Sequence, residues 1–270
     1  MPDTFTAEHH GGTGPPLVCL HGFSDTWRTW DLMLPALERH HEVLAPTLAG
    51  HAGGPPLGEL TDDTLADAVE VAMDEAGFET AHIVGNSLGG FVALQLAARG
   101  RARTVVAFAP AGGWAEDDES HRDLLALQAQ MQQLARAAAP HAEALVASPE
   151  GRRAATEYIT INFEHIPGEL LAHQIQGVAG CAGAPTLIEY ALHQRWSLDA
   201  GKITCPVRIV WGADDRLLPW PASAVRYRDE WLPKADWVEL DDVGHCPQLD
   251  IPREAAQLVL GFTQPRRPGS

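Results

Sequence analysis

One stretch of the chain, residues 85–89 (GNSLG), has the G-x-S-x-G spacing of a nucleophile turn. The apolar residues before it, 81–84, are typical of a buried strand, and those after it, 91–97, have helical spacing. A reversal this sharp strains the central residue and leaves room only for glycine beside it. It would lift the Ser87 hydroxyl clear of a sheet, at a helix N-terminus that favours a developing anion. A glycine-rich turn with an incidental serine is the competing interpretation.

A nucleophilic Ser87 needs a base, because a serine alkoxide is inaccessible at neutral pH. A histidine can take up and return a proton in that range, and a carboxylate behind it fixes the tautomer. His245 lies between the last expected strand and the last expected helix, and Asp215 lies in the loop after the preceding strand. These loops would meet Ser87 at one edge of a sheet, in the chain order Ser, Asp, His. Asp214 is the alternative acid, since only one of two adjacent side chains on a turn can reach the histidine.

The elements that must position these residues alternate along the chain. Runs typical of buried strands lie at residues 15–20, 42–45, 81–84, 103–109, 205–212 and 237–240. Helical segments separate most of them, which predicts a mostly parallel, doubly wound α/β sheet with helices on both faces. Between residues 111 and 201 helical segments punctuated by prolines replace the strands. We therefore expect an α/β core of residues 1–110 and 202–270, with a helical cap, residues 111–201, inserted after the sixth strand over the carboxyl edge of the sheet.

The charge balance narrows the range of partners. The 19 basic and 36 acidic residues give a formal net charge of −17, which opposes binding to nucleic acid or to an anionic membrane. No apolar run reaches the roughly 20 residues that span a bilayer, and the N-terminus lacks the pattern of a secretory signal. We therefore expect a cytoplasmic protein, a monomer or homodimer, whose partner is a small-molecule substrate.

Cysteine and histidine usage gives no sign of a metal or cofactor. The four cysteines are scattered without a C-x-x-C pair, so we expect them to be reduced. Thirteen histidines are present, but none has the spacing of a known zinc site, so neither a metal nor a cofactor is expected. His51, in a loop rich in glycine and proline, could be a base, but the role of anchoring its loop is favoured.

Four stretches of the chain together resemble the α/β-hydrolase superfamily, in its capped esterase-like and carbon–carbon-hydrolase-like branches. They are HGF at 21–23, GNSLGG at 85–90, WGADDRLLP at 211–219 and GHCPQLDIP at 244–252. The resemblance covers residues 17–262, and it implies a catalytic triad of Ser87, Asp215 and His245. It also implies that the backbone amides of Phe23 and Leu88 form an oxyanion hole, and that His21 holds its loop.

The resemblance implies hydrolysis of a carboxylic ester, with lactones and thioesters as related substrates, through an acyl-enzyme on Ser87. The activity would be carboxylesterase-like, and Phe23, Trp114 and the cap helices would contact the substrate. A serine at position 87 argues against the dehalogenase and epoxide-hydrolase branches, which use an aspartate there.

Two alternatives remain open. One is carbon–carbon bond hydrolysis of a vinylogous diketone, because GNSLGG resembles the nucleophile motif of that branch. That branch usually carries glycine-proline-glycine after the H-G pair and a tryptophan after the catalytic histidine; residues 24–26 (SDT) and Cys246 stand there instead. The other alternative is a small-molecule receptor whose triad is slow.

Overall fold

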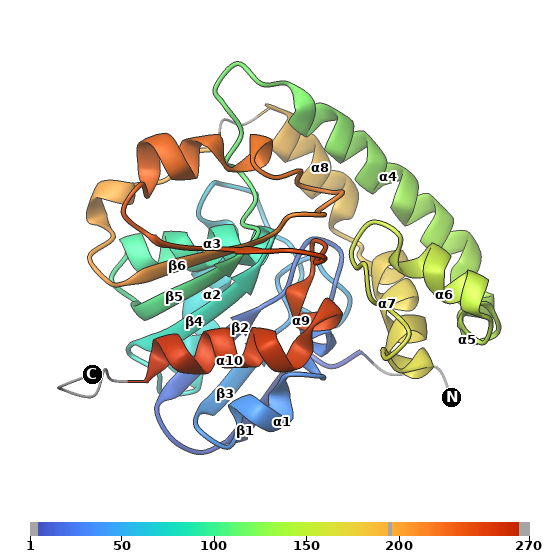
Figure 1. Ribbon diagram of the computed structural model, residues 1–270, viewed down its shortest axis with the longest axis horizontal. Helices are drawn as coiled ribbons and strands as arrows, with labels where there is room; N and C mark the ends of the chain where they lie inside the picture. Colours follow the sequence, from blue (N-terminus) through green and yellow to red (C-terminus); the bar gives the residue numbers. More distant parts are fainter. Residues whose placement is uncertain (1–4, 194–195, 265–270) are drawn as a thin grey trace.

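Seven strands form a single sheet in the order β1-β3-β2-β4-β5-β6-β7 in the computed structural model, which describes residues 5–193 and 196–264 (Figure 1). The strands are Glu8–Gly12 (β1), Pro16–Leu20 (β2), Glu42–Pro46 (β3), Ala81–Asn86 (β4), Ala102–Phe108 (β5), Val207–Gly212 (β6) and Asp236–Leu240 (β7). All neighbours pair in parallel except β1 and β3, which pair antiparallel. The predicted mostly parallel α/β fold is confirmed.

Helices cover both faces of the sheet because the central strands are apolar on both sides. Five helices belong to these layers: Leu34–Leu37 (α1), Thr64–Glu75 (α2), Leu88–Ala98 (α3), Pro247–Asp250 (α9) and Pro252–Thr263 (α10). Alternate residues of β2 enter different cores: Val18 and Leu20 pack with α2 and α3, whereas Leu17 and Cys19 pack with α1 and α10. This sandwich makes β4 a rigid base for the residues at its carboxyl end.

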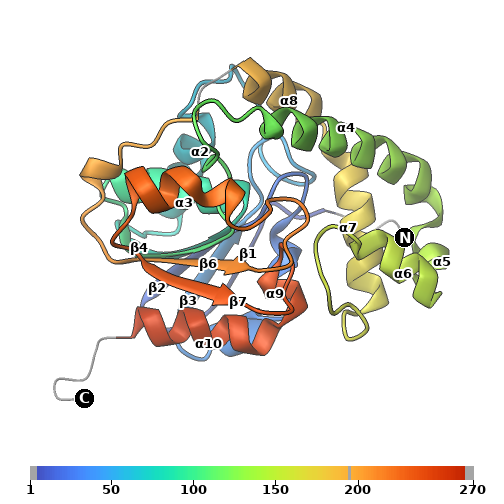
Figure 2. The same cartoon turned by 45° about the horizontal axis from the view of Figure 1, so that its top comes forward.

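Five further α-helices lie between β5 and β6, and no strand does among the described residues. They are Ser120–Ala138 (α4), Ala142–Val146 (α5), Pro149–Thr156 (α6), Gly168–Gly180 (α7) and Ala184–His193 (α8). Figure 2 shows them at the end of the molecule toward which the arrowheads of β6 and β7 point. These inserted helices therefore lie at the carboxyl edge of the sheet, where Ser87 follows β4.

Two details differ from the sequence prediction. The edge strand β1, Glu8–Gly12, was not predicted, because its residues (EHHGG) are polar and form no apolar run. The insertion follows β5, the fifth strand of the chain, and the expectation that it follows a sixth strand was wrong. The reason is that β1 is the only strand before β2 in the described residues, so the central strand β4 is the fourth along the chain.

No helix in the described residues combines the length and the apolar character that crossing a bilayer requires.

Candidate active site

Ser87 sits at a strained turn between β4 and α3. Its φ and ψ are 54° and −117°, a conformation that non-glycine residues rarely adopt. A Cβ atom on Gly85 would collide with the carbonyl oxygen of Gly89, and one on Gly89 would collide with that of Leu20. The backbone of Ser87 is held in place on the neighbouring strand, because its N–H donates to the carbonyl oxygen of Phe108 at 2.9 Å. The tight packing explains why both flanking positions are glycine.

Asp215 and His245 form a buried pair at the same edge of the sheet. His245 Nδ1 lies 2.7 Å from Asp215 Oδ2, and both residues are less than 5% exposed. The other oxygen of Asp215 accepts hydrogen bonds from the backbone N–H groups of Leu217 (2.9 Å) and Leu218 (2.8 Å). These donors hold the carboxylate in place, and the carboxylate directs the imidazole through Nδ1. Asp214, the alternative acid, is exposed to solvent.

Ser87 and His245 line the same cavity, which has a volume of about 430 Å³. No hydrogen bond joins the Ser87 hydroxyl to the His245 ring among the described residues. In structures without substrate, hydrogen bonds of this kind are often long and tighten only in the reacting complex. The tertiary structure thus brings together three residues that lie up to 158 positions apart in the chain.

Asn86 connects the nucleophile turn to the histidine loop, a role that the sequence did not reveal. Its side-chain amide donates to the carbonyl oxygen of His245 at 2.9 Å and to that of Phe108 at 3.2 Å. Its Oδ1 accepts from Gln248 Nε2 at 3.0 Å. Asn86 is buried, so these bonds do not compete with water. They hold the His245 backbone at a constant position relative to Ser87.

Asp250 ties the histidine loop to the inserted helices. Its carboxylate accepts from the backbone N–H groups of Gly244 (2.6 Å), Ile161 (2.9 Å) and Asn162 (2.7 Å), and it is 2% exposed. The last two donors belong to the segment between α6 and α7. The resemblance drew on the segment that contains Asp250, but Ile161 and Asn162 lie almost ninety positions away in the chain, so this role was not predictable.

The loop that follows β2 carries the first expected oxyanion donor. His21 holds this loop, as expected: its Nε2 accepts from the Leu48 N–H at 2.9 Å, and its Nδ1 donates to the Gly22 carbonyl oxygen at 2.7 Å. A Cβ atom on Gly22 would lie 3.3 Å from Ser87 Cβ, so the loop passes directly beside the serine. Within the described residues no protein acceptor was found for the N–H groups of Phe23 and Leu88. The role of these two amides as oxyanion donors stays a prediction.

His51 is buried against the same loop and does not reach the Asp215–His245 pair. Its ring lies 4.9 Å from that of His21 and 6.0 Å from that of Phe23, and its Nδ1 donates to the Ala49 carbonyl oxygen at 3.1 Å. Burial lowers the pKa of His51 to about 4. Burial also lowers the pKa of His21 well below its ordinary value, helped by the neighbouring His51. Both rings are therefore neutral at pH 7 and anchor the loop.

The lowered pKa values of His21 and His51 predict that the protein loses stability in acid. A histidine in the unfolded chain has a pKa of about 6.5, so below this pH the unfolded state binds protons that the folded state refuses. The free energy of unfolding should therefore fall as the pH drops from about 6.5 toward 4, by up to about 3 kcal/mol for His51 alone. Asp25 opposes part of this loss, because burial raises its pKa to about 6 and the folded state then takes up a proton first.

Urea denaturation at about pH 7 and pH 5 would measure this loss. The His51→Gln variant should show a smaller difference between the two pH values than the parent protein. His40→Gln, at an exposed position, is the matched control and should show the parent difference. An unchanged pH dependence in His51→Gln would contradict the assignment.

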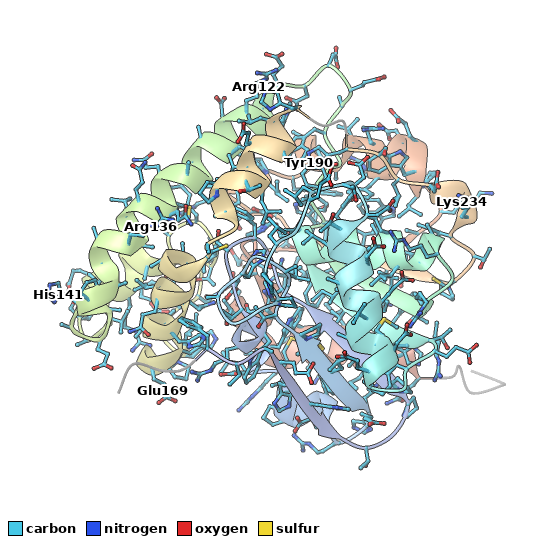
Figure 3. All side chains as sticks on the ribbon, turned by 180° about the vertical axis from the view of Figure 1, so that it is seen from behind. Arg122, Arg136, His141, Glu169, Tyr190 and Lys234 are labelled. Carbon is cyan, nitrogen blue, oxygen red and sulfur yellow. The ribbon has the colours of Figure 1, made fainter. Side chains whose placement is uncertain are left out.

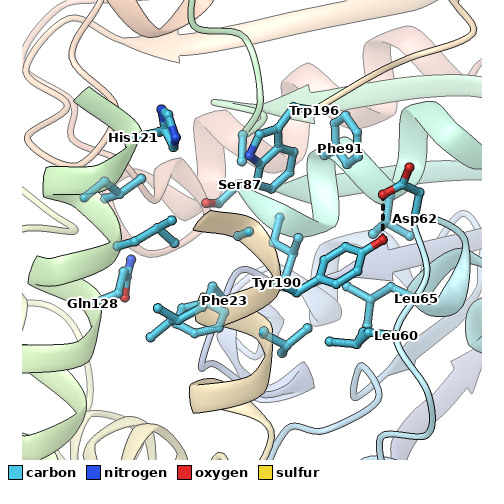
Figure 4. A pocket seen from close by; sticks show the side chains of 18 of the residues that line it. Phe23, Leu60, Asp62, Leu65, Ser87, Phe91, His121, Gln128, Tyr190 and Trp196 are labelled. Atoms are coloured by element: carbon cyan, nitrogen blue, oxygen red, sulfur yellow. Dashed lines mark hydrogen bonds between the residues drawn. The ribbon is translucent and has the colours of Figure 1, made fainter. Parts of the chain in front are cut away.

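The cavity beside Ser87 has two compartments that meet at Phe23, Ser87 and Gln128. The first, the Trp114 compartment, has a volume of about 130 Å³ and an apolar wall that includes Phe91, Trp114, Trp196 and leucines from α4 and α8. In Figure 4 the Ser87 hydroxyl points into this space, and a hydrogen bond of 2.7 Å from Tyr190 to Asp62 joins α8 to the loop before α2. Trp114 therefore lines this compartment, and its contact with a substrate stays a prediction.

The second, the Asp25 compartment, is the 430 Å³ cavity that also contains His245. Its wall comes from the loop after β2 and from the inserted helices α4 to α7. An extended molecule with its reactive group at Ser87 could thus place one arm in each compartment. No group of three or more acidic, histidine or cysteine side chains in the described residues could hold a metal ion.

Comparison with known proteins agrees with this architecture. Residues 15–252 match the family described as alpha/beta hydrolase fold, and the chain belongs to this family. It is therefore an enzyme of the hydrolase class defined by that fold.

Individual relatives differ in chemistry. The chain is 32% identical over 206 residues to the epoxide hydrolase EphH of Mycobacterium tuberculosis, a match that covers 76% of this chain and 96% of that protein. It is 28% identical to a pimeloyl-[acyl-carrier protein] methyl ester esterase of Aromatoleum aromaticum, over 91% of this chain and 96% of the esterase. The solved structure of an enol-lactonase from Burkholderia xenovorans LB400 matches with a TM-score of 0.70 at 21% sequence identity. The match covers 94% of this chain and 95% of the enol-lactonase chain, and it shows a similarity of fold.

Proposed function

We propose that this protein is a serine hydrolase that cleaves a carboxylic ester, lactone or thioester through an acyl-enzyme on Ser87. The observation that carries the proposal is the common cavity of Ser87 and His245, with His245 Nδ1 hydrogen-bonded to Asp215 at 2.7 Å. Ser87 supplies the nucleophile, His245 the base, and Asp215 the group that orients the base. The esterase relative from Aromatoleum aromaticum supports this chemistry.

The reaction would proceed in two halves. In the first, Ser87 Oγ attacks the carbonyl carbon while His245 Nε2 takes its proton, and the Phe23 and Leu88 N–H groups stabilise the oxyanion. Collapse of this intermediate breaks the bond to the leaving alcohol, which receives the proton from His245. In the second half, His245 takes a proton from water as the water oxygen attacks the acyl carbon. When this second intermediate collapses, the bond to Ser87 Oγ breaks, His245 returns the proton to Ser87 Oγ, and the acid is released.

The identity of the nucleophile separates this proposal from epoxide hydrolysis, the activity in the name of the relative EphH. A serine oxygen that opened an epoxide would remain bound to carbon as an ether. An ether has no carbonyl carbon for water to attack, so the enzyme would be trapped after one turnover. With an ester substrate the group left on Ser87 is an acyl group, which water can remove. Ser87 therefore favours acyl substrates.

The inserted helices would act as the lid of this site. We propose that residues 111–201 form a cap that encloses the substrate, because α4 and α8 line the Trp114 compartment and α4 to α7 line the Asp25 compartment. The core formed by residues 1–110 and 202–270 would supply all the reacting groups. Substrate selection would then depend on the cap.

A labelling experiment tests the proposed function. The protein is treated with a fluorophosphonate, and mass spectrometry locates the adduct; we expect it on Ser87 and on no other serine. A panel of p-nitrophenyl esters, lactones, thioesters, epoxides and vinylogous diketones then ranks the substrate classes. We expect ester turnover with a burst of p-nitrophenol equal to the enzyme concentration. Turnover of the diketone without ester turnover would favour carbon–carbon bond hydrolysis, and binding without any turnover would favour a receptor.

A further inference from the structure

The Asp25 compartment contains a carboxylate that has no cationic partner among the described residues. Asp25 lies two residues beyond Phe23, and one of its oxygens accepts from the Thr26 N–H at 2.8 Å. The other oxygen lies 3.5 Å from Gln174 Nε2, at the limit of a hydrogen bond, and the Thr29 side chain also hydrogen-bonds to the carboxyl group. All three partners are uncharged. The negative charge of Asp25 is therefore not compensated within the protein.

A second acceptor in the same compartment has no partner. Gln174 on α7 is 8% exposed, and its Oε1 accepts no hydrogen bond within the described part of the chain. A buried carbonyl oxygen without a donor costs about 1–3 kcal/mol, so such groups are rare in folded proteins. Gln174 and Asp25 both line the cavity. The Gln174 Oε1 atom itself is closed off from the cavity, so Asp25 is the member of this pair that a ligand in the cavity can contact.

The surrounding charges favour a cation as the ligand of Asp25. The wall of this compartment contains Asp25 and Glu157 but no lysine or arginine. Arg122 and Arg136 of α4, labelled in Figure 3, are exposed, and neither lines this compartment. Burial raises the pKa of Asp25 to about 6, the direction expected for a carboxyl group without a counter-ion. Asp25 is still ionised at pH 7, and the net charge of −17 attracts cations toward the protein.

We infer that the Asp25 compartment binds a positively charged amine of the substrate, with the ammonium group donating to the Asp25 carboxylate. An ammonium ion has three donors and no acceptor, so it can donate to the carboxylate of Asp25 and compensate its charge. A hydroxyl group offers one donor and no charge, and a carboxylate would be repelled. The inference rests on the proposed function, and it narrows the substrate to an ester or lactone that carries an amine on the arm entering this compartment.

Calorimetry can test the inference without catalysis. The Ser87→Ala protein, at about pH 8, is titrated with n-hexylammonium chloride and with its isostere 1-hexanol. We expect the ammonium ion to bind at least about tenfold more tightly than the alcohol. Introducing Asp25→Asn into the same protein should reduce this preference to less than about threefold. If Asp25 only held its loop through Thr26, its replacement would weaken both ligands together and leave the ratio unchanged.

A matched control tests whether any negative charge in the wall, and not Asp25 in particular, produces the preference for the ammonium ion. Glu157 is the other acid in the wall but is exposed, so Glu157→Gln should keep the preference for the ammonium ion. Hexylammonium should also slow fluorophosphonate labelling of Ser87 in the parent protein, because it occupies the cavity beside it. Equal affinity for the two ligands, a preference that survives Asp25→Asn, a preference lost in Glu157→Gln, or binding that leaves labelling unaffected would each overturn the inference.

Failure of the proposed function would be recognised separately. If Ser87 is not labelled and no ester is hydrolysed, the proposed function fails. The preference for hexylammonium over 1-hexanol, and its loss in Asp25→Asn, would still test the amine site. If esters are hydrolysed but hexylammonium and 1-hexanol bind with equal affinity, only the proposed amine site is wrong.

Discussion

Replacing Ser87 by alanine is expected to lower kcat for ester hydrolysis by about 10⁴-fold or more, because no other group supplies the nucleophile. The fold should be retained, since the Ser87 side chain makes no capping hydrogen bond to α3. The two amides beside Ser87 remain, so substrate binding should change little. Steady-state kinetics and a urea denaturation curve measure the two effects.

Ser197→Ala is the matched control for this experiment. Ser197 lines the Trp114 compartment, but it is exposed and lies outside the turn between β4 and α3. Its replacement should change kcat by less than about threefold. If Ser87→Ala retained full activity, or if Ser197→Ala lost it, Ser87 would not be the nucleophile.

Replacing Asp215 by asparagine is expected to lower kcat by about 10⁴-fold, the second large effect. Asp215 accepts from His245 Nδ1 at 2.7 Å, so the carboxylate keeps the proton on Nδ1 and leaves Nε2 free as a base. An amide NH₂ in that place would donate to Nδ1, move the ring proton to Nε2 and remove the base. KM should change far less than kcat, because the affected group acts in the transition state.

The neighbouring acid provides the control for this prediction. Asp214 is exposed, whereas Asp215 is 4% exposed and receives two backbone hydrogen bonds. Asp214→Asn should therefore keep kcat within about twofold. A large loss in Asp214→Asn together with a small loss in Asp215→Asn would reverse the assignment of the acid.

Much of the fold could be predicted because the sequence patterns that indicate it are local. The buried strands contain continuous apolar runs, since both faces of the sheet are covered, and the nucleophile turn needs glycine at 85 and 89 for steric reasons that act within a few residues. The edge strand β1 has neither signal. It is polar, and its place in the sheet depends on hydrogen bonds to β3, whose paired residues lie 30 to 38 positions away in the chain.

The amino-acid sequence by itself determined the class of fold, the order of its elements and the residues with the chemistry for nucleophilic catalysis, because these depend on side-chain type and short-range spacing. Only the tertiary structure decided that Asn86 joins the nucleophile turn to the histidine loop, that Asp250 ties this loop to the inserted helices, and that two compartments meet at Ser87. Each of these contacts joins segments far apart in the chain. They form only when the inserted helices and the sheet have packed, and no local pattern records which partners that packing brings within hydrogen-bonding distance.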